Sequence, residues 1–418
     1  MEERRRQRID FWQNIAITLL TVSAVALFLQ TQLYRLGAER YRDFFSLAAA
    51  QTDTAGGGYT MGITAPVRVA VSNPYGRYAD VDMRTDDENF SALGRILREA
   101  LLSVGKAEPC TEEQFRAALN GTSVYYDFLH PLPLSILSGL TGAEGSDEET
   151  LARMLTAAAG EDGLVLYTYD GEETYLRFTT AVTADALEST VNRFEMGSAR
   201  FAYESGMETI APYTLFLQER KALPSLREAV LNVDPEAVLE AMQFNPRTNY
   251  RYAESEGTEV VVEGSRTLRV HTDGSISYQS GGEEVLTVDA ADTSLEALAE
   301  GTDRLLDTLM AASGGQGNLY LTSIARGDET VTLTYGYEVG GVPIRLFNRN
   351  DAATVTLSGT GVAEMEVWLR QYTVADEMSN LLPVGQAAAI AQQHGKQELF
   401  IGYVGGGVGT LQAQWLVE

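Results

Sequence analysis

The sequence has few of the residues that most often carry catalysis and metal binding. Its 418 residues include one cysteine, Cys110, and three histidines, His130, His271 and His394, which stand more than a hundred residues apart. A single cysteine excludes an internal disulfide, and isolated histidines do not form the closely spaced ligand pairs of a zinc site. The sequence therefore predicts no disulfide, no bound metal and no cofactor.

Lysine is also scarce, and its scarcity decides how one catalytic motif is interpreted. Ser103 and Lys106 match the S-x-x-K motif of penicillin-recognising enzymes, which also need a buried serine at a helix start and a K-T-G motif. The chain has three lysines and no K-T-G, and Ser103 falls where a helix is expected to end. We predict no catalytic residue and a non-enzymatic function, with a triad assembled from distant residues as the alternative.

Two other patterns that could mark ligand sites have a structural interpretation. The glycine-rich run from Gly402 to Thr410 is expected to be a flexible hairpin turn between two strands. A phosphate-binding loop would instead lead from a strand into a helix. The tyrosine-rich segments Tyr125-Tyr126 and Tyr335 to Tyr337 are expected to be half-buried sheet residues rather than a sugar-stacking surface.

Only one stretch of the chain is apolar over a length that could cross a bilayer. Ile15 to Leu29 is apolar apart from three hydroxyl residues, and extension to Phe11 and Tyr34 gives 24 residues with aromatic side chains near both ends. No small-x-small cleavage site follows the run, so it predicts a retained signal anchor rather than a cleaved signal peptide. Four arginines precede the span and three follow it, which favours a cytoplasmic N-terminus and an extracytoplasmic body in the cell membrane.

The predicted span contains side chains that permit close contact with another helix. Small and hydroxyl residues are typical of such contacts within a bilayer. The candidate contact residues are Ala16, Thr18, Thr21, Ser23 and Ala26.

The charge balance limits the classes of partner. The formal net charge is −27, and the first 42 residues hold seven arginines against four acidic residues, so the remainder carries −30. A surface of this sign repels phosphate backbones, and we predict no nucleic-acid binding. The near absence of cysteine fits a bacterial cell surface better than a secreted eukaryotic protein.

Capping and turn residues predict alternating helices and short strands. Helices are expected at 90–105, from a Thr111 and Gln114 capping box to Gly121, from Ser146 and Glu149 to Gly160, and at 184–194, 235–244, 294–312 and 383–393. Strands are expected at 64–71, in a hairpin turned at Asp170-Gly171, and in many short segments after Glu259.

This order predicts an α+β fold: a transmembrane helix followed by a multi-domain body of antiparallel sheets with helices packed on one face. The predicted divisions are a cytoplasmic segment and anchor (1–42), a stalk (43–60), an N-terminal α+β domain (61–145), a middle α+β domain (146–248) and a C-terminal domain (249–418). The last is a candidate duplication of two strand-strand-helix halves.

Several segments of the sequence resemble sequences of the YycH and YycI family of Gram-positive bacteria. They include VSNPYGRY, EEQFRAALNGTSVYYDFLHPLPLSIL, IRLFNRND, EMEVWLRQYT, LLPVGQAAAIAQQ, LFIGYV and LQAQW. The resemblance implies a YycI-like C-terminal domain in a single-span protein that regulates the sensor histidine kinase of a two-component system controlling cell-wall metabolism. It implies contacts through the transmembrane helix and the extracytoplasmic body, with a paralogous regulator as a second candidate partner. An extracytoplasmic binding module for cell-wall polymer or peptide is the alternative function.

Overall fold

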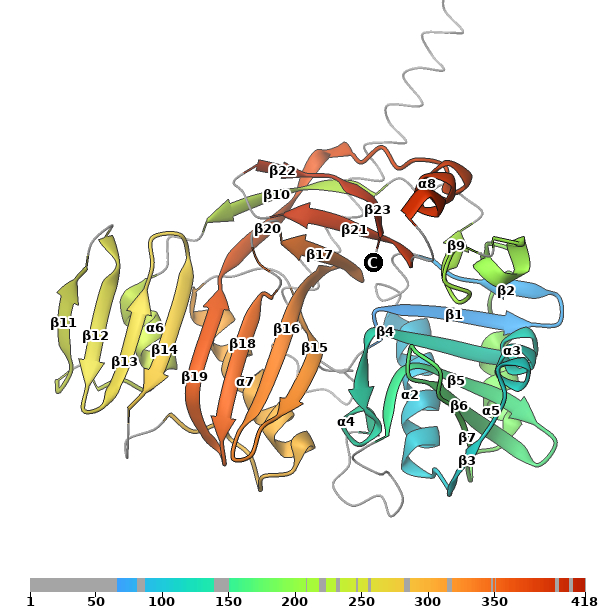
Figure 1. Cartoon of the computed structure of the whole chain (residues 1–418), viewed down its shortest axis with the longest axis horizontal. Coiled ribbons are helices and arrows are strands. Elements are labelled where there is room, and N and C mark those ends of the chain that lie inside the picture. The colour runs from blue at the N-terminus through green and yellow to red at the C-terminus, as the bar shows by residue number, and fades with distance from the viewer. Residues whose placement is uncertain are drawn as a thin grey trace, which may run out of the picture. The chain divides into compact units, whose positions relative to one another are not determined.

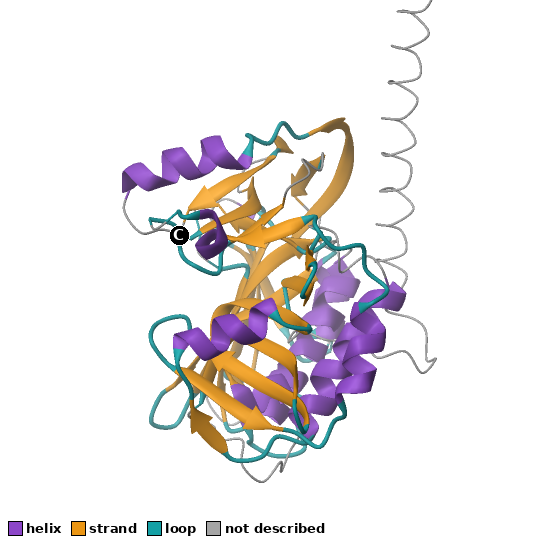
Figure 2. Cartoon of the chain, turned by 90° about the vertical axis from the view of Figure 1, so that its right-hand side faces the viewer, coloured by secondary structure: helices purple, strands orange, loops and turns teal. Residues whose placement is uncertain are grey.

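The computed structural model has a mixed α+β fold made mostly of antiparallel sheet, with few helices (Figure 1, Figure 2). The predicted α+β class is therefore confirmed. Every described residue belongs to one compact unit, Ala55–Glu418. The structure describes residues 66–80, 87–138, 150–207, 209–217, 223–230, 234–245, 247–254, 257–281, 286–313, 318–346, 349, 351–394, 398–405 and 409–417.

The first sheet is formed by the N-terminal part of the described chain. Within that part its strand order is β3-β7-β6-β5-β4-β1-β2-β8-β9, and all neighbouring strands are antiparallel. Its strands are β1 Arg68–Asn73, β2 Gly76–Tyr78, β3 Ala107–Pro109, β4 Ser123–Pro133, β5 Leu151–Gly160, β6 Gly163–Tyr169, β7 Tyr175–Thr179, β8 Ala199–Phe201 and β9 Leu215–Leu217. β5, β4 and β1 lie in the middle of this order and carry long buried runs.

Local sequence signals account for the helices that accompany this sheet. The helices are α2 Asp87–Leu102, α3 Glu112–Asn120, α4 Leu134–Ser138 and α5 Ala184–Val191, with a 3-10 turn at Ala202–Ser205. Thr111 and Gln114 form the predicted reciprocal capping box at the start of α3. The helix predicted at 90–105 ends at Leu102, because Gly105 turns away and its N–H donates to the Thr179 carbonyl at 2.8 Å.

The second large sheet is formed by the C-terminal part. Its order is β11-β12-β13-β14-β19-β18-β16-β17-β21-β23, with β15 also paired to β16, and the β17–β21 pair is parallel. Its strands are β11 Tyr250–Ala253, β12 Glu259–Glu263, β13 Arg266–Val270, β14 Ser275–Ser280, β15 Asn318–Arg326, β16 Val331–Val339, β17 Val342–Leu346, β18 Ala353–Ser358, β19 Gly361–Trp368, β21 Leu399–Gly405 and β23 Ala413–Val417. The helices α6 Pro235–Ala241 and α7 Leu295–Ser313 lie behind these strands in Figure 1. The Tyr337 hydroxyl donates to the Trp368 carbonyl at 2.6 Å, and its oxygen lies 3.6 Å from the Met310 sulfur of α7, so strand β16 and α7 share one core.

A small third sheet changes the interpretation of the glycine-rich run. It contains β10 Pro224–Val230 between β20 Arg370–Met378 and β22 Gly409–Leu411. The chain passes from β21 to β22 without pairing them, because β21 pairs with β23 and β22 pairs with β10. The run therefore joins two strands, as predicted, but it is not the turn of a hairpin. The helix α8 Val384–Ala391 and a 3-10 turn at Gln392–His394 precede β21.

The helix predicted from Ser146 and Glu149 to Gly160 is wrong. Residues 151–160 form β5, which pairs with β4 on one side and β6 on the other. Alanine and leucine favour helices by only a few tenths of a kcal/mol per residue, and pairing along two neighbouring strands outweighs that preference. The small alanines also let α3 and α5 pack closely against this strand. Ser146 and Glu149 themselves lie outside the described residues.

The predicted divisions at 145 and 248 do not coincide with the borders of sheets. β4 and β5 come from opposite sides of residue 145 and belong to one sheet. β10 and β20 come from opposite sides of residue 248 and pair over most of their length. The division of the body into three domains stays a prediction, as does the duplication in 249–418.

The predicted membrane span, Phe11 to Tyr34, lies outside the described residues. Among the residues that the structure does describe, no helix is both long enough and apolar enough to cross a membrane. The candidate contact residues Ala16, Thr18, Thr21, Ser23 and Ala26 lie in the same undescribed segment.

Candidate functional site

An irregular turn in β4 lies where charged side chains of the two large sheets form ion pairs. The register of β4 against β5 shifts between Asp127 and Leu132, and Leu129 has a left-handed backbone with φ 67°. This conformation costs a bulky residue about 1–3 kcal/mol and persists only where neighbours enforce it. The Leu129 N–H donates to Asp127 Oδ1 at 2.8 Å, so the Asp127 carboxylate holds the turn.

Asp127 is also part of a buried cluster of four charges. Arg68 on β1 lies 2.5 Å from Asp127 Oδ2 and 2.6 Å from Glu398 Oε1, between Nη2 and each carboxylate oxygen. Arg153 on β5 pairs with Glu398, and its Nε is 3.7 Å from Asp127 Oδ1. The side chains are 17%, 1%, 15% and 9% exposed for Arg68, Asp127, Arg153 and Glu398. Because water is largely excluded, these ion pairs are screened much less than pairs at the surface.

In this cluster of four residues, which we call the Arg68 cluster, neighbouring charges favour the ionised forms of Arg68 and Glu398. Burial raises the pKa of Glu398, but Arg68 and Arg153 outweigh burial, so the pKa lies below its usual value. Burial lowers the pKa of Arg68, and Asp127 and Glu398 reverse this effect, so the pKa lies above its usual value. Two guanidinium groups and two carboxylates therefore make a neutral cluster that ties β1, β4 and β5 to the start of β21.

A small cleft of about 50 Å³, partly open to solvent, lies beside the Arg68 cluster. Its walls come from both large sheets and are mostly apolar. The lining residues are Val67, Arg68, Val69, Asp80, Leu129, Leu215, Leu217, Gly341, Pro343, Phe400, Ile401 and Trp415. The guanidinium groups of Arg68 and Arg345 each lie 5.8 Å from the centre of the Phe400 ring, a cation–π distance.

The composition of the cleft favours binding over acid–base chemistry. Both arginines of the cluster already share carboxylate partners, and the Arg68 Nε–H is buried without a hydrogen-bond acceptor among the described residues. In the described part of the chain there is no group of three or more His, Cys, Asp or Glu side chains that could hold a metal ion.

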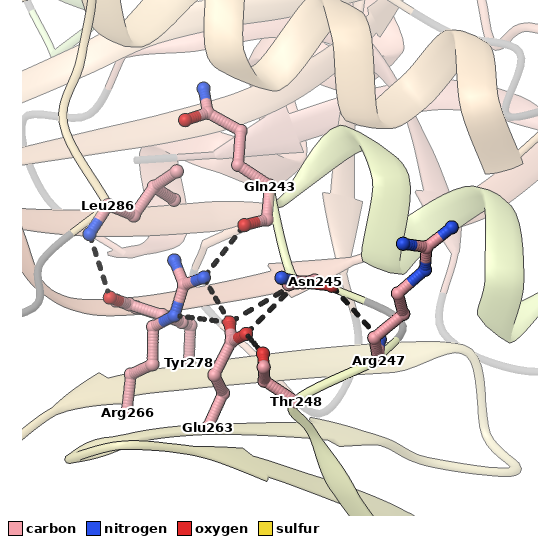
Figure 3. Close-up of polar contacts among 8 residues, drawn as sticks. All are labelled: Gln243, Asn245, Arg247, Thr248, Glu263, Arg266, Tyr278 and Leu286. Carbon is pink, nitrogen blue, oxygen red and sulfur yellow. Dashed lines mark hydrogen bonds and ion pairs between the residues drawn. The ribbon is translucent and has the colours of Figure 1, made fainter.

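A second buried network has a structural role (Figure 3). Glu263 accepts from the Asn245 N–H at 3.2 Å and the Thr248 hydroxyl at 2.5 Å, and it pairs with Arg266. Arg266 also donates to the Gln243 carbonyl at 2.7 Å. Gln243 has a left-handed backbone with φ 56°. These bonds fix the turn between α6 and β11, and none of their groups lines the cleft.

The residues considered as catalytic candidates are dispersed. Ser103 lies at the end of α2, as expected, where its hydroxyl donates to the Glu99 carbonyl at 2.8 Å. His130 is on β4, His271 follows β13, and His394 is in the 3-10 turn after α8. Burial raises the pKa of the Cys110 thiol, the opposite of what an activated nucleophile needs.

The tyrosine-rich segments are core residues. Tyr125, Tyr126, Tyr335 and Tyr337 are all fully buried, so the structural interpretation of these segments is confirmed and their burial is deeper than predicted. They offer no surface for sugar stacking.

The sequence analysis missed the four residues of the Arg68 cluster. Asp127 and Arg153 each stand within a strand that is otherwise almost entirely apolar. Charged residues are rarely buried unless they are paired, so a lone charge in an apolar strand is a usable signal. The identity of their partner could not be read locally, because Glu398 is 245 residues from Arg153.

Comparison of the chain with protein-family models, with curated proteins and with solved structures finds no match.

Proposed function

We propose that this chain is a non-enzymatic, membrane-anchored regulator of a sensor histidine kinase, with its body outside the cell. The apolar segment from Phe11 to Tyr34 supports an anchor, and the net charge of −30 on the remainder argues against nucleic-acid partners. The resemblance to the YycH and YycI family supports the kinase as partner and a paralogous regulator as a second one.

The observation that carries the proposal is the cleft beside the Arg68 cluster. Its walls are apolar and its internal charges are compensated within the chain, which suits the reversible contact of a protein partner. A regulator shifts a kinase between two states only if it binds one state more tightly than the other. The body supplies a surface for such a difference, and the span supplies a second contact.

Exchange of Ile15 to Leu29 for an unrelated apolar span of equal length should change kinase output a few-fold. A typical interhelical hydrogen bond in a membrane contributes about 0.6 kcal/mol, so loss of one or two contacts gives this magnitude. Output is read from a wall-hydrolase reporter, at matched protein level and orientation. The matched control exchanges the same span but restores Ala16, Thr18, Thr21, Ser23 and Ala26, and it should recover the original output. Equal output from all three proteins would remove the span from the mechanism.

The alternative, a binding module for cell-wall polymer, is favoured by one feature of the second sheet. Tyr250 and Tyr252 on the edge strand β11 are 67% and 39% exposed, and their ring centres are 5.8 Å apart. Single exposed aromatic residues are normal, whereas two neighbouring rings form a continuous apolar surface. They form a place where sugar rings could stack.

Removal of both rings tests this alternative. If the body binds wall polymer through β11, Tyr250→Ala with Tyr252→Ala should reduce cosedimentation with purified cell walls roughly tenfold, since each stacking contact contributes about 0.5–1.5 kcal/mol. Tyr75→Ala is the matched control, because Tyr75 is 91% exposed and lies between β1 and β2 on the other large sheet. Equal binding by the two variants would exclude β11 as the polymer site.

A further inference from the structure

We infer that the cleft beside the Arg68 cluster binds an extended peptide segment with uncharged, apolar side chains, contributed by the extracytoplasmic part of a partner protein. The inference deepens the proposed function, because it names the chemistry of the contact that the body makes.

The borders of the cleft favour an extended backbone. β9 pairs only with β8, and β23 pairs only with β21, so within the described chain each is the edge strand of its sheet. Leu215 and Leu217 of β9 and Trp415 of β23 all line the cleft. On β23 the Ala413 N–H already donates to the Ser379 hydroxyl, and the Val417 carbonyl already accepts from Arg345. An extended peptide would therefore pair with the N–H and C=O groups at the edge of β9 while its alternate side chains enter the cleft.

The charges in the cleft favour an uncharged occupant. The two guanidinium groups of Arg68 and Arg153 are matched by Asp127 and Glu398. The other charged residue of the lining is Asp80. A ligand carboxylate would have to compete with Asp127 and Glu398 for their arginines, at a cost that a neutral peptide does not bear.

One feature next to the cleft points to a ligand rather than to packing alone. Leu129 lines the cleft in a left-handed conformation, and backbone strain of this kind concentrates at binding sites.

The test uses Trp415 as a reporter inside the cleft. The chain has three tryptophans, and Trp12→Phe with Trp368→Phe leaves Trp415 alone in the full-length protein, held in lipid nanodiscs. The probe is the blocked peptide acetyl-Thr-Val-Thr-Leu-Thr-Val-amide, titrated while Trp415 emission is recorded, with empty nanodiscs subtracted. We expect a saturable shift. The same peptide with every second amide N-methylated cannot pair with a strand edge and should bind at least about tenfold more weakly.

Matched variants and a second ligand class decide the outcome. Leu217→Asn should weaken peptide binding about tenfold by removing apolar surface from the cleft, whereas Leu102→Asn, at an exposed leucine at the end of α2, should not change it. Octanoate, with an apolar chain of similar size and a carboxylate, should produce no saturable shift.

Saturation by octanoate, or equal binding of the N-methylated peptide, would overturn the inference. Failure of the peptide to bind while kinase output still depends on the body would also overturn it, yet would leave the proposed function standing. Loss of any dependence of kinase output on the chain would instead remove the proposed function.

Discussion

Replacement of Glu398 by alanine should lower the free energy of unfolding of the body by about 3–5 kcal/mol, the usual cost of leaving buried charges without a partner. Glu398 is 9% exposed and bonds both Arg68 and Arg153, so its loss leaves two guanidinium groups to share the carboxylate of Asp127. The segment Ala55–Glu418 is one compact unit, and its urea unfolding midpoint measures the change. Glu398→Gln should cost less, because the amide keeps one oxygen that accepts from an arginine.

An exposed ion pair provides the control for this prediction. Glu108 and Arg177 lie 2.7 Å apart but are 55% and 44% exposed, so Glu108→Ala should leave the unfolding midpoint within experimental error. If Glu398→Ala and Glu108→Ala had equal effects, the Arg68 cluster would not join the sheets as described.

The same cluster predicts the pH dependence of stability. Since the pKa of Glu398 is lower in the folded body than its unfolded value of about 4.3, its contribution is complete above that unfolded value and is lost as the pH falls through the folded pKa. Arg68, whose pKa is raised, stays charged throughout this range. Unfolding curves between pH 7 and pH 3 should therefore converge for the original protein and the Glu398→Ala variant as the pH falls. Parallel curves would show that Glu398 is not ionised in the cluster.

Replacement of Phe115 by alanine should cost about 3–5 kcal/mol, as large-to-small changes at fully buried aromatic residues do. Phe115 on α3 is 0% exposed, and its ring centre lies 6.2 Å from Tyr169, 5.4 Å from Tyr175 and 5.2 Å from Tyr213. These tyrosines also interact with one another, and the hydroxyls of Tyr175 and Tyr213 are 3.1 Å apart. The residual cavity cannot close without separating them, so the loss should exceed the transfer energy of the ring alone.

A size-conserving change separates packing from other effects at this position. Phe115→Leu keeps most of the volume and should cost about 1–1.5 kcal/mol in the same urea experiment. A loss below 1 kcal/mol for Phe115→Ala would mean that the aromatic cluster does not support the first sheet.

Much of the local structure could be predicted because its causes lie within a few residues. The Thr111–Gln114 capping box starts α3, and Asp234 caps α6 ahead of Pro235, with its side chain accepting from the Glu236 N–H at 3.0 Å. The hairpin turn at Asp170 forms because its carboxylate accepts three successive backbone N–H groups. Such bonds depend on spacing alone, and spacing is visible in a sequence.

The one wrong helix shows where this kind of inference ends. The alanine-rich segment 151–160 satisfies helix propensity as well as strand pairing, and only the presence of β4 and β6 on either side decides between them. The partner of β21 is a second example. Both β22 and β23 follow β21 closely in the sequence, but β23 pairs with β21 whereas β22 pairs with β10.

By itself the sequence determined the α+β class, the acidic surface and the starts of helices α3 and α6, because composition and short-range hydrogen bonds cause them. Only the tertiary structure decided the candidate site. Arg68 and Glu398 are 330 residues apart, and neither residue has a distinctive neighbour in the chain. They meet because strands of two sheets bring them together and bury both side chains, which are 17% and 9% exposed. In that environment an ionised side chain is stable only beside a side chain of opposite charge.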